Sequence, residues 1–270
     1  MVAPSRSAVV GTLRAAGCVF AEDEADLLIG TAATGAVLTA MIARRVSGEP
    51  LEQVVGWALF RGLRISLDPG VFVPRRRSEF LVEQAIHLSP RQRKTVVVDL
   101  CCGSGALGIA LADALDDVEL VAADVDPAAV RCARRNVEAV GGTVFEGDLF
   151  APLPPDLAGR VDVLLANVPY VPTEAVALMP PEARLHEPRV ALDGGADGLD
   201  VLRRVAAEAP GWLAPGGHLL VETSDRQAAE ATQVMAAGGL TAQTTYDEDR
   251  GATVVIGHKA EPRPTGRADR

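Results

Sequence analysis

The chain has 270 residues, 48% of them hydrophobic, and a formal net charge of −10 at pH 7. This length is enough for one large domain, or for a medium domain with a small companion. No apolar run is long enough to cross a bilayer and no signal-peptide core lies near the start, so we expect a cytoplasmic protein without a membrane contact. The acidic balance argues against direct nucleic-acid binding, which needs clustered positive charge.

The four cysteines do not indicate a metal site. Cys18, Cys101, Cys102 and Cys132 lack the C-x-x-C spacing of zinc centres, so no metal is predicted. The adjacent pair Cys101 and Cys102 allows two interpretations, redox chemistry or small apolar residues in a turn. We favour the turn, because cytoplasmic thiols stay reduced and pack as small apolar side chains.

The first part of the chain has the pattern of a small helical domain over residues 1–50. Amphipathic segments begin near Ser7, at the acidic residues 22–24 and at Thr34, and Gly48-Glu49-Pro50 ends the last one. A linker of residues 51–77 follows. In it, two apolar stretches flank Arg61-Gly62, which predicts a β-hairpin.

From residue 78 to residue 259 strands alternate with helices. The predicted strands are residues 95–100, 118–124, 143–146, 161–166, 219–223, 241–246 and 253–257. This alternation predicts an α/β fold with a doubly wound, mostly parallel, Rossmann-like sheet of seven strands. The last two strands are joined too closely for a parallel crossover, so a terminal antiparallel strand is expected. We expect residues 171–197 to form a functional loop and residues 260–270 to be a disordered tail.

A glycine-rich turn, Cys101-Cys102-Gly103-Ser104-Gly105, follows the first strand of this sheet. Gly103 and Gly105 let the backbone approach a ligand closely, and the N-terminus of the next helix favours a negative group. A nucleotide phosphate or a carboxylate fits there. The turn alone is weak support for a nucleotide, because cysteines precede the glycines of the usual dinucleotide pattern.

Acidic residues follow the second and third strands. Asp124 lies about 20 residues beyond the glycine turn, where a carboxylate accepts hydrogen bonds from the ribose of NAD or of S-adenosylmethionine (SAM). Asp126 precedes Pro127 and fits a helix N-cap instead. Asp148 is predicted to accept a hydrogen bond from an adenine amino group, with the apolar Leu149 against the ring.

The sequence Asn167-Val168-Pro169-Tyr170 follows a buried strand, at the edge where open α/β sheets bind ligands. An amide nitrogen is a poor nucleophile, because its lone pair is delocalised into the carbonyl and no ordinary side-chain base removes its proton at pH 7. Two acceptors, Asn167 Oδ1 and the Val168 carbonyl, can instead hold its two N–H groups. Pro169 stiffens the turn, and Tyr170 can pack on the planar group and on a methyl cation. Catalysis then consists of positioning and electrostatic stabilisation.

This box and the glycine turn resemble the N-P-P-Y box and the D-x-G-x-G loop of SAM-dependent methyltransferases that act on planar nitrogens. Residues 72–79, 191–199 and 213–222 resemble three further motifs of the protein-(glutamine-N5) methyltransferase family of the PrmC/HemK type. The resemblance implies a class I methyltransferase fold, which takes SAM and releases S-adenosyl-L-homocysteine. It implies catalytic roles for Asn167, Val168, Pro169 and Tyr170, a cofactor site of Asp99, Cys101, Gly103, Ser104, Gly105, Asp124, Val125, Asp148, Leu149 and Asn167, and a substrate site of Phe72, Pro74, Arg75 and Glu79.

The resemblance also implies a protein substrate, namely a glutamine in the Gly-Gly-Gln sequence of a peptide chain release factor or in a ribosomal protein. The N-terminal helical segment matches in size the family's substrate-docking domain. The sequence departs from the family pattern at three places. Cys101 replaces a glycine, Val168 replaces the first proline of the box, and Arg77-Ser78 replaces a Glu-Thr pair at the rim of the substrate site.

Other functions stay open at this point. One is an N-methyltransferase of a small molecule or of a nucleobase amino group on the same scaffold. Another is a SAM-binding protein without catalysis, against which the retained Asn167, Pro169 and Tyr170 argue. A NAD(P) oxidoreductase is disfavoured, because no acid/base partner accompanies the glycine turn.

Overall fold

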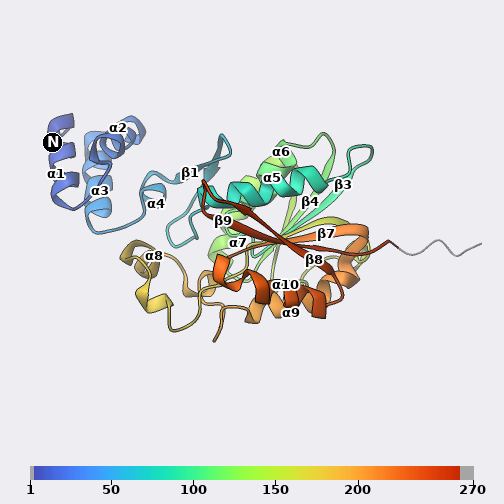
Figure 1. The fold of residues 1–270 in the computed structure, drawn as a ribbon. Coiled ribbons are helices and arrows are strands. Elements are labelled where there is room, and N and C mark those ends of the chain that lie inside the picture. The colour runs from blue at the N-terminus through green and yellow to red at the C-terminus, as the bar shows by residue number, and fades with distance from the viewer. Residues whose placement is uncertain (1–2, 262–270) are drawn as a thin grey trace, which may run out of the picture.

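The computed structural model describes residues 3–261, and its first part is a small helical unit that stands beside the main body of the protein (Figure 1). Its helices are α1 (Arg6–Ala15), α2 (Ala21–Thr31), α3 (Gly35–Val46) and α4 (Leu51–Val55). Ser5 and Thr34 start α1 and α3 by accepting a hydrogen bond from a backbone N–H of the first turn. The helices bury a core of their own, which includes Leu13, Leu28 and Met41. The three predicted helices are confirmed, and the short α4 was not foreseen.

The predicted hairpin consists of β1 (Trp57–Phe60) and β2 (Leu63–Ser66). Arg61 and Gly62 both have positive φ, 47° and 80°, as the tightest hairpin turn requires. Phe60 and Ile65 are buried in the core of the main domain rather than in the core of the helical unit. The hairpin is therefore packed as a part of the main domain.

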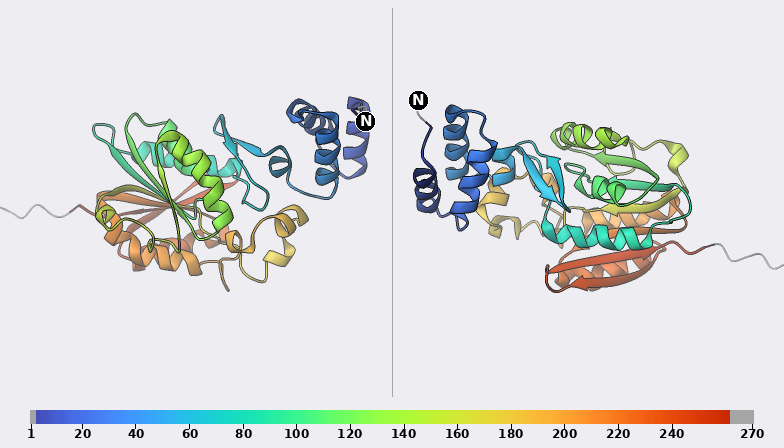
Figure 2. Two further views of the ribbon diagram at one scale, coloured as in Figure 1. Left: turned by 180° about the vertical axis from the view of Figure 1, so that it is seen from behind. Right: turned by 90° about the horizontal axis from the view of Figure 1, so that it is seen from above.

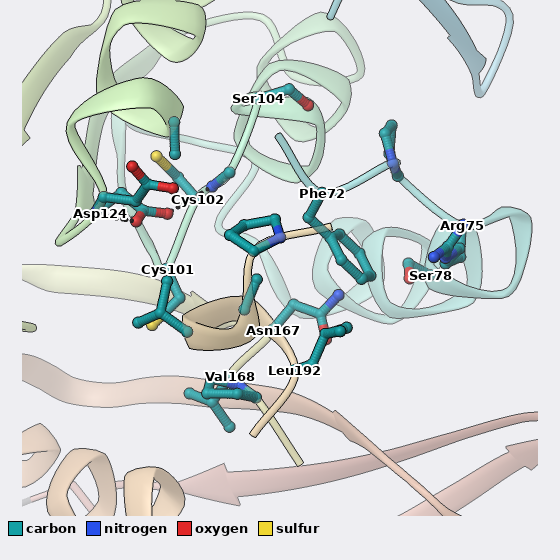
Figure 3. Close-up of a pocket in the computed structure, with 18 of the residues that line it drawn as sticks. Phe72, Arg75, Ser78, Cys101, Cys102, Ser104, Asp124, Asn167, Val168 and Leu192 are labelled. Atoms are coloured by element: carbon teal, nitrogen blue, oxygen red, sulfur yellow. Dashed lines mark hydrogen bonds between the residues drawn. The ribbon is translucent and has the colours of Figure 1, made fainter. Parts of the chain in front are cut away.

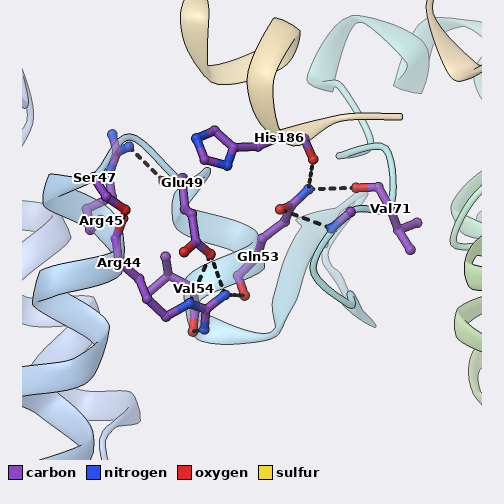
Figure 4. A network of polar contacts seen from close by, with 9 residues as sticks. Arg44, Arg45, Ser47, Glu49, Gln53, Val54, Val71 and His186 are labelled. Carbon is purple, nitrogen blue, oxygen red and sulfur yellow. Dashed lines mark hydrogen bonds and ion pairs between the residues drawn. The ribbon is translucent and has the colours of Figure 1, made fainter. Parts of the chain in front are cut away.

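A buried glutamine connects the helical unit to the main domain (Figure 4). The Gln53 amide nitrogen donates to the carbonyls of Val71, at 2.9 Å, and His186, at 3.3 Å. The Arg44 guanidinium, near the end of α3, donates to the Gln53 carbonyl at 3.1 Å and pairs with Glu49 at 2.7 Å. These contacts bring α4, the segment after the hairpin and the loop of residues 171–197 together.

The main domain is one seven-stranded sheet with helices on both faces, as predicted. Its elements are α5 (Glu79–Leu88), β3 (Thr95–Leu100), α6 (Ala106–Asp113), β4 (Val118–Asp124), α7 (Pro127–Val137), β5 (Thr143–Glu146), β6 (Val161–Ala166), α8 (Pro181–His186), α9 (Asp200–Trp212), β7 (Leu213–Thr223), α10 (Ala228–Ala237), β8 (Thr241–Asp247) and β9 (Ala252–His258). The strand order is β5-β4-β3-β6-β7-β9-β8, and β9 runs antiparallel to both of its neighbours.

Two separate cores hold the layers together. Side chains of α5, α6 and α7 pack on one face of the sheet, and those of α9 and α10 on the other. Figures 1 and 2 show these two helical layers with the sheet between them. Every residue of β3 and of β6 is buried, as expected for central parallel strands covered on both sides.

The structure differs from the sequence prediction mainly outside the central strands. β7 begins at Leu213 rather than at residue 219, because Leu213 already pairs with Val161 before a register shift. The predicted loop of residues 171–197 contains the helix α8. Asp126 caps α7, as expected, by accepting from the Ala128 N–H. The predicted tail falls largely on residues 262–270, which lie outside the described residues. Within residues 3–261, no helix combines the length and the apolarity that a membrane crossing needs.

Candidate active site

A cavity opens at the carboxyl ends of β4, β3 and β6. The chain order reverses between β3 and β6, because α6 and α7 lead outward to β4 and β5 whereas β6 starts the other half of the sheet. Parallel sheets leave a crevice at such a switch point. The cavity brings together the glycine turn, Asp124, the box of residues 167–170 and the segment around Phe72 (Figure 3).

The glycine turn adopts a tight left-handed path. Cys101, Gly103 and Gly105 have φ values of 52°, 57° and 80°. A side chain at Gly105 would also meet Val137 Cγ2 at 2.6 Å, so only glycine fits between the turn and α7. Cys101 holds a left-handed conformation that costs a non-glycine residue about 1–2 kcal/mol. This explains why the family pattern has glycine there.

Neither cysteine of the turn is set up for reactivity. Burial is the main cause that raises the pKa of the Cys101 and Cys102 thiols, and the nearby Asp124 and Asp99 raise it further. Both cysteines are without a disulfide. A thiol that stays protonated at neutral pH is a poor nucleophile and a poor metal ligand, which agrees with a structural role in the turn.

Asp124 is held at the cavity wall by the backbone. Its Oδ2 accepts from the Gly103 N–H at 2.8 Å, and its Oδ1 accepts from the Asp126 N–H at 2.9 Å. Each carboxylate oxygen keeps one lone pair for a ligand. Burial raises the pKa of Asp124, while these backbone donors act in the opposite direction. A pair of hydroxyl donors in the cavity would complete the hydrogen bonding of this carboxylate.

The box supplies two residues of the cavity lining, Asn167 and Val168, whose side-chain and main-chain oxygens accept no hydrogen bond from the described residues. Figure 3 shows the Asn167 side chain near Phe72 and Leu192, and draws no hydrogen bond from it to the other residues shown. The Val168 side chain is buried, and its carbonyl receives no backbone N–H within residues 3–261. Val168 replaces a proline of the family pattern without loss of the carbonyl. Two unused oxygens at one wall match the two N–H groups of a primary amide.

Glycines of the loop after the box allow the backbone to close around it. A side chain at Gly194 would meet the Pro169 carbonyl at 2.5 Å, and one at Gly198 would meet the Tyr170 carbonyl at 2.2 Å. Gln227 also holds the box in place, because its Nε2 donates a hydrogen bond to the Tyr170 carbonyl at 2.9 Å. The glycine-rich stretch 194–198 is thus explained by close packing against the box. Gln227 was not predicted, and no pattern in the sequence marks it.

An ion pair between the buried Glu222 and the partly exposed Arg77 fixes the Tyr170 ring. Glu222, with a side chain 2% exposed, accepts from Arg77 Nε at 2.8 Å, from Ser78 Oγ at 2.5 Å and from the Tyr170 hydroxyl at 3.1 Å. Arg77 also donates to the Tyr170 oxygen. Burial raises the pKa of the phenol, which keeps its proton for Glu222. Glu222 could have been found from the sequence, because a lone charge ends the apolar run of residues 219–221.

The predicted substrate segment is anchored to the loop on the far side of the cavity. Arg75 pairs with the buried Glu187 at 2.6 Å, and its guanidinium carbon lies 4.8 Å from the centre of the Phe72 ring. Phe72, Pro74 and Arg75 all line the cavity. The same holds for Cys101, Gly103, Ser104, Asp124, Val125 and the four box residues.

Several predicted site residues do not line the cavity. The Asp99 side chain is fully buried under the glycine turn, where its Oδ2 accepts from the Gly108 N–H at 2.9 Å. Gly105 and Leu149 lie behind the cavity wall, as their contacts with α7 and with the core show. The Asp148 carboxylate pairs with Arg204 at 2.5 Å at the surface. Glu79 accepts from the Arg61 N–H and so supports the hairpin turn instead.

Comparisons with known proteins agree with this geometry. Residues 62–195 match the family model "Methyltransferase small domain". The release factor glutamine methyltransferase of Geobacter sulfurreducens is 38% identical over 80% of this chain and 75% of its own length. The chain belongs to the release factor glutamine methyltransferase family.

Two further proteins are similar to this chain, one in sequence and one in fold. A protein of Streptomyces pristinaespiralis is 36% identical over 73% of this chain and 69% of its own length. It is named 4-amino-L-phenylalanine/4-methylamino-L-phenylalanine methyltransferase. A methyltransferase structure from Pyrococcus furiosus shares the fold, with a TM-score of 0.56, 18% identity and coverage of 82% of this chain and 99% of that one. The family's SAM-dependent methyltransferase fold is thus the fold of this chain.

Proposed function

We propose that this protein transfers the methyl group of SAM to the side-chain amide nitrogen of a glutamine in a peptide chain release factor. The observation that supports this best is the pair of unused oxygens on Asn167 and Val168. They lie at the wall of a cavity that Asp124 and the glycine turn also line. A primary amide has two N–H donors, and this wall offers two acceptors.

The cavity fits SAM by the chemistry of its donors and acceptors. When bound, SAM supplies an electrophilic methyl group. The N-terminus of α6 and the glycine turn suit its carboxylate, because backbone N–H groups and the helix dipole favour a negative group. The two Asp124 oxygens suit the ribose hydroxyls. The ion pair of Asp148 with Arg204 at the surface does not support the predicted contact of Asp148 with the adenine.

The residues of the chain act by positioning the amide. Asn167 Oδ1 and the Val168 carbonyl accept its two N–H groups and stabilise the positive charge that develops on nitrogen during transfer. The Tyr170 ring, held by Glu222 and Arg77, forms a rigid wall for the planar amide. Such preorganised groups lower the barrier because they need no rearrangement in the transition state.

The test is methylation of a purified release factor with isotopically labelled SAM. We expect one labelled methyl group on the glutamine of the Gly-Gly-Gln sequence, located by mass spectrometry of peptides. The Asn167→Ala variant, which keeps Asp124 and the glycine turn, serves as the negative control. Absence of label from the release factor, in the presence of a wild-type protein that binds SAM, contradicts this function.

A second candidate is N-methylation of an aromatic amine on a free amino acid. The observation that favours it is the similarity to the protein of Streptomyces pristinaespiralis that is named for this activity. Turnover of 4-amino-L-phenylalanine without turnover of a release factor would support this candidate over the first.

A further inference from the structure

A second cleft lies beside the first cavity at the same edge of the sheet. β7 ends at Thr223 and β8 ends at Asp247, and both residues line this cleft together with the residues that follow them. Arg77 and Tyr170 line the cleft and the first cavity alike. The two spaces therefore share one wall, and the Tyr170 ring of the box belongs to it.

The lining of this second cleft suits a cation. Asp225, Asp247 and Glu248 line it beside the rings of Tyr170 and Tyr246. Asp247 is partly engaged by Arg250 at 3.4 Å, whereas neither Asp225 nor Glu248 has an ion-pair partner in the described part of the chain. Carboxylates next to aromatic faces are the groups that bind guanidinium and ammonium ions.

The positive charge of Arg77 does not cancel this acidic character. Its guanidinium pairs with Glu222 at 2.8 Å, and Glu222 is buried beneath it. The three carboxylates that line the cleft, Asp225, Asp247 and Glu248, therefore outnumber the positive charge that is left at its wall.

An unpartnered hydroxyl in the same wall points to a ligand independently of the charges. Thr223 is 5% exposed, and its buried Oγ1 has no hydrogen-bond partner in residues 3–261. A buried hydroxyl without a partner costs about 1–3 kcal/mol. This oxygen has almost no accessible surface, so a guanidinium or ammonium group in the cleft would give it a donor once the Thr223 side chain turns toward the cleft.

We propose that the second cleft binds a cationic side chain, arginine or lysine, of the polypeptide segment that flanks the target glutamine. The inference rests on the proposed function, because a polypeptide acceptor held at Tyr170 is what brings a flanking side chain to this wall. The cleft then contributes to the choice of substrate, whereas Asn167 and Val168 contribute to the reaction itself.

The test uses the full chain and two fluorescein-labelled peptides. One contains Gly-Gly-Gln flanked by arginine on both sides, and the other carries citrulline, the uncharged isostere, in place of each arginine. Fluorescence anisotropy measures binding, and transfer from labelled SAM is measured separately. We expect the wild-type protein to bind the arginine peptide about fivefold more tightly, the range of one or two partly exposed ion pairs. The double variant Asp225→Asn/Glu248→Gln should lose this preference, and Thr223→Val should reduce it.

Asp249→Asn provides the matched control. Asp249 lies in the same exposed turn as Glu248 but does not line the cleft, so its replacement should keep the preference. High salt should reduce the preference in the wild type, because exposed charges are screened. Equal binding of the two peptides by the wild type, an unchanged preference in the double variant, or an equal loss in Asp249→Asn would each overturn the proposal.

The two readouts separate this proposal from the proposed function. A charge preference in binding, without methyl transfer to the peptide or to an intact release factor, contradicts the function and supports the cleft. Methyl transfer without a charge preference supports the function and contradicts the cleft.

Discussion

Replacement of Asp99 by asparagine should change how the stability of the protein depends on pH. Asp99 is fully buried, and burial is the main cause that raises its pKa from 3.8 to about 8. In the unfolded chain this carboxyl titrates near its ordinary value. Between these two pKa values the folded protein therefore binds one proton more than the unfolded chain, and stability is lost as the pH rises.

The magnitude follows from the two pKa values. The contribution of Asp99 to the unfolding free energy falls by about 1.4 kcal/mol per pH unit, or about 3 kcal/mol between pH 5 and pH 7. Asparagine keeps an acceptor for the Gly108 N–H and has no charge to bury. Its amide nitrogen takes the place of Oδ1, which has no hydrogen-bond partner in the described residues. The unpaired amide therefore lowers the unfolding free energy by about 1–3 kcal/mol, equally at each pH.

Urea unfolding without SAM, followed by circular dichroism at pH 5, 6 and 7, measures this difference. We expect Asp99→Asn to be the less stable protein at pH 5 and to gain about 3 kcal/mol relative to the wild type by pH 7. Asp116→Asn, at an exposed position after α6, controls for the loss of one carboxylate. A difference between wild type and Asp99→Asn that stays constant from pH 5 to pH 7 would refute the reasoning.

Three further predictions concern the site. Asn167→Ala should lower the rate constant of single-turnover methyl transfer by about 10²-fold or more, the effect of removing one preorganised group, and should leave SAM affinity nearly unchanged. A wild-type rate constant in this variant would mean that the box is only a turn. Asp124→Ala should weaken SAM binding by one or two charge-assisted hydrogen bonds, about 1.5–3 kcal/mol each, and unchanged affinity in calorimetry would remove Asp124 from the ribose site. Removal of residues 1–46 should keep SAM affinity and raise KM for a release factor, because the core that α1–α3 form with α4 lies apart from the cavity. Methylation at the full rate would place substrate docking elsewhere.

The strand pattern of the main domain could be predicted because each central strand is a continuous apolar run. β3 and β6 are buried on both faces, so every position must be apolar or paired, and the run is visible in the sequence. The helix α8 and the start of β7 were missed for the opposite reason. Their residues are ordered by contacts with distant segments, as in the pairing of Leu213 with Val161, and carry little periodicity of their own.

The sequence by itself was enough to predict which groups act as acceptors in the candidate site, because the glycine turn and the box each consist of a few adjacent residues. Asn167, the Val168 carbonyl and the glycine turn are local features of this kind. Only the tertiary structure decided which side chains support them. Glu222, Arg77 and Tyr170 are far apart in the chain. They meet because β6 and β7 end, and α5 begins, at one edge of the sheet. Long-range packing also decides that Asp148 pairs with Arg204 and that Glu79 accepts from the hairpin turn. No local pattern in the sequence shows these partners.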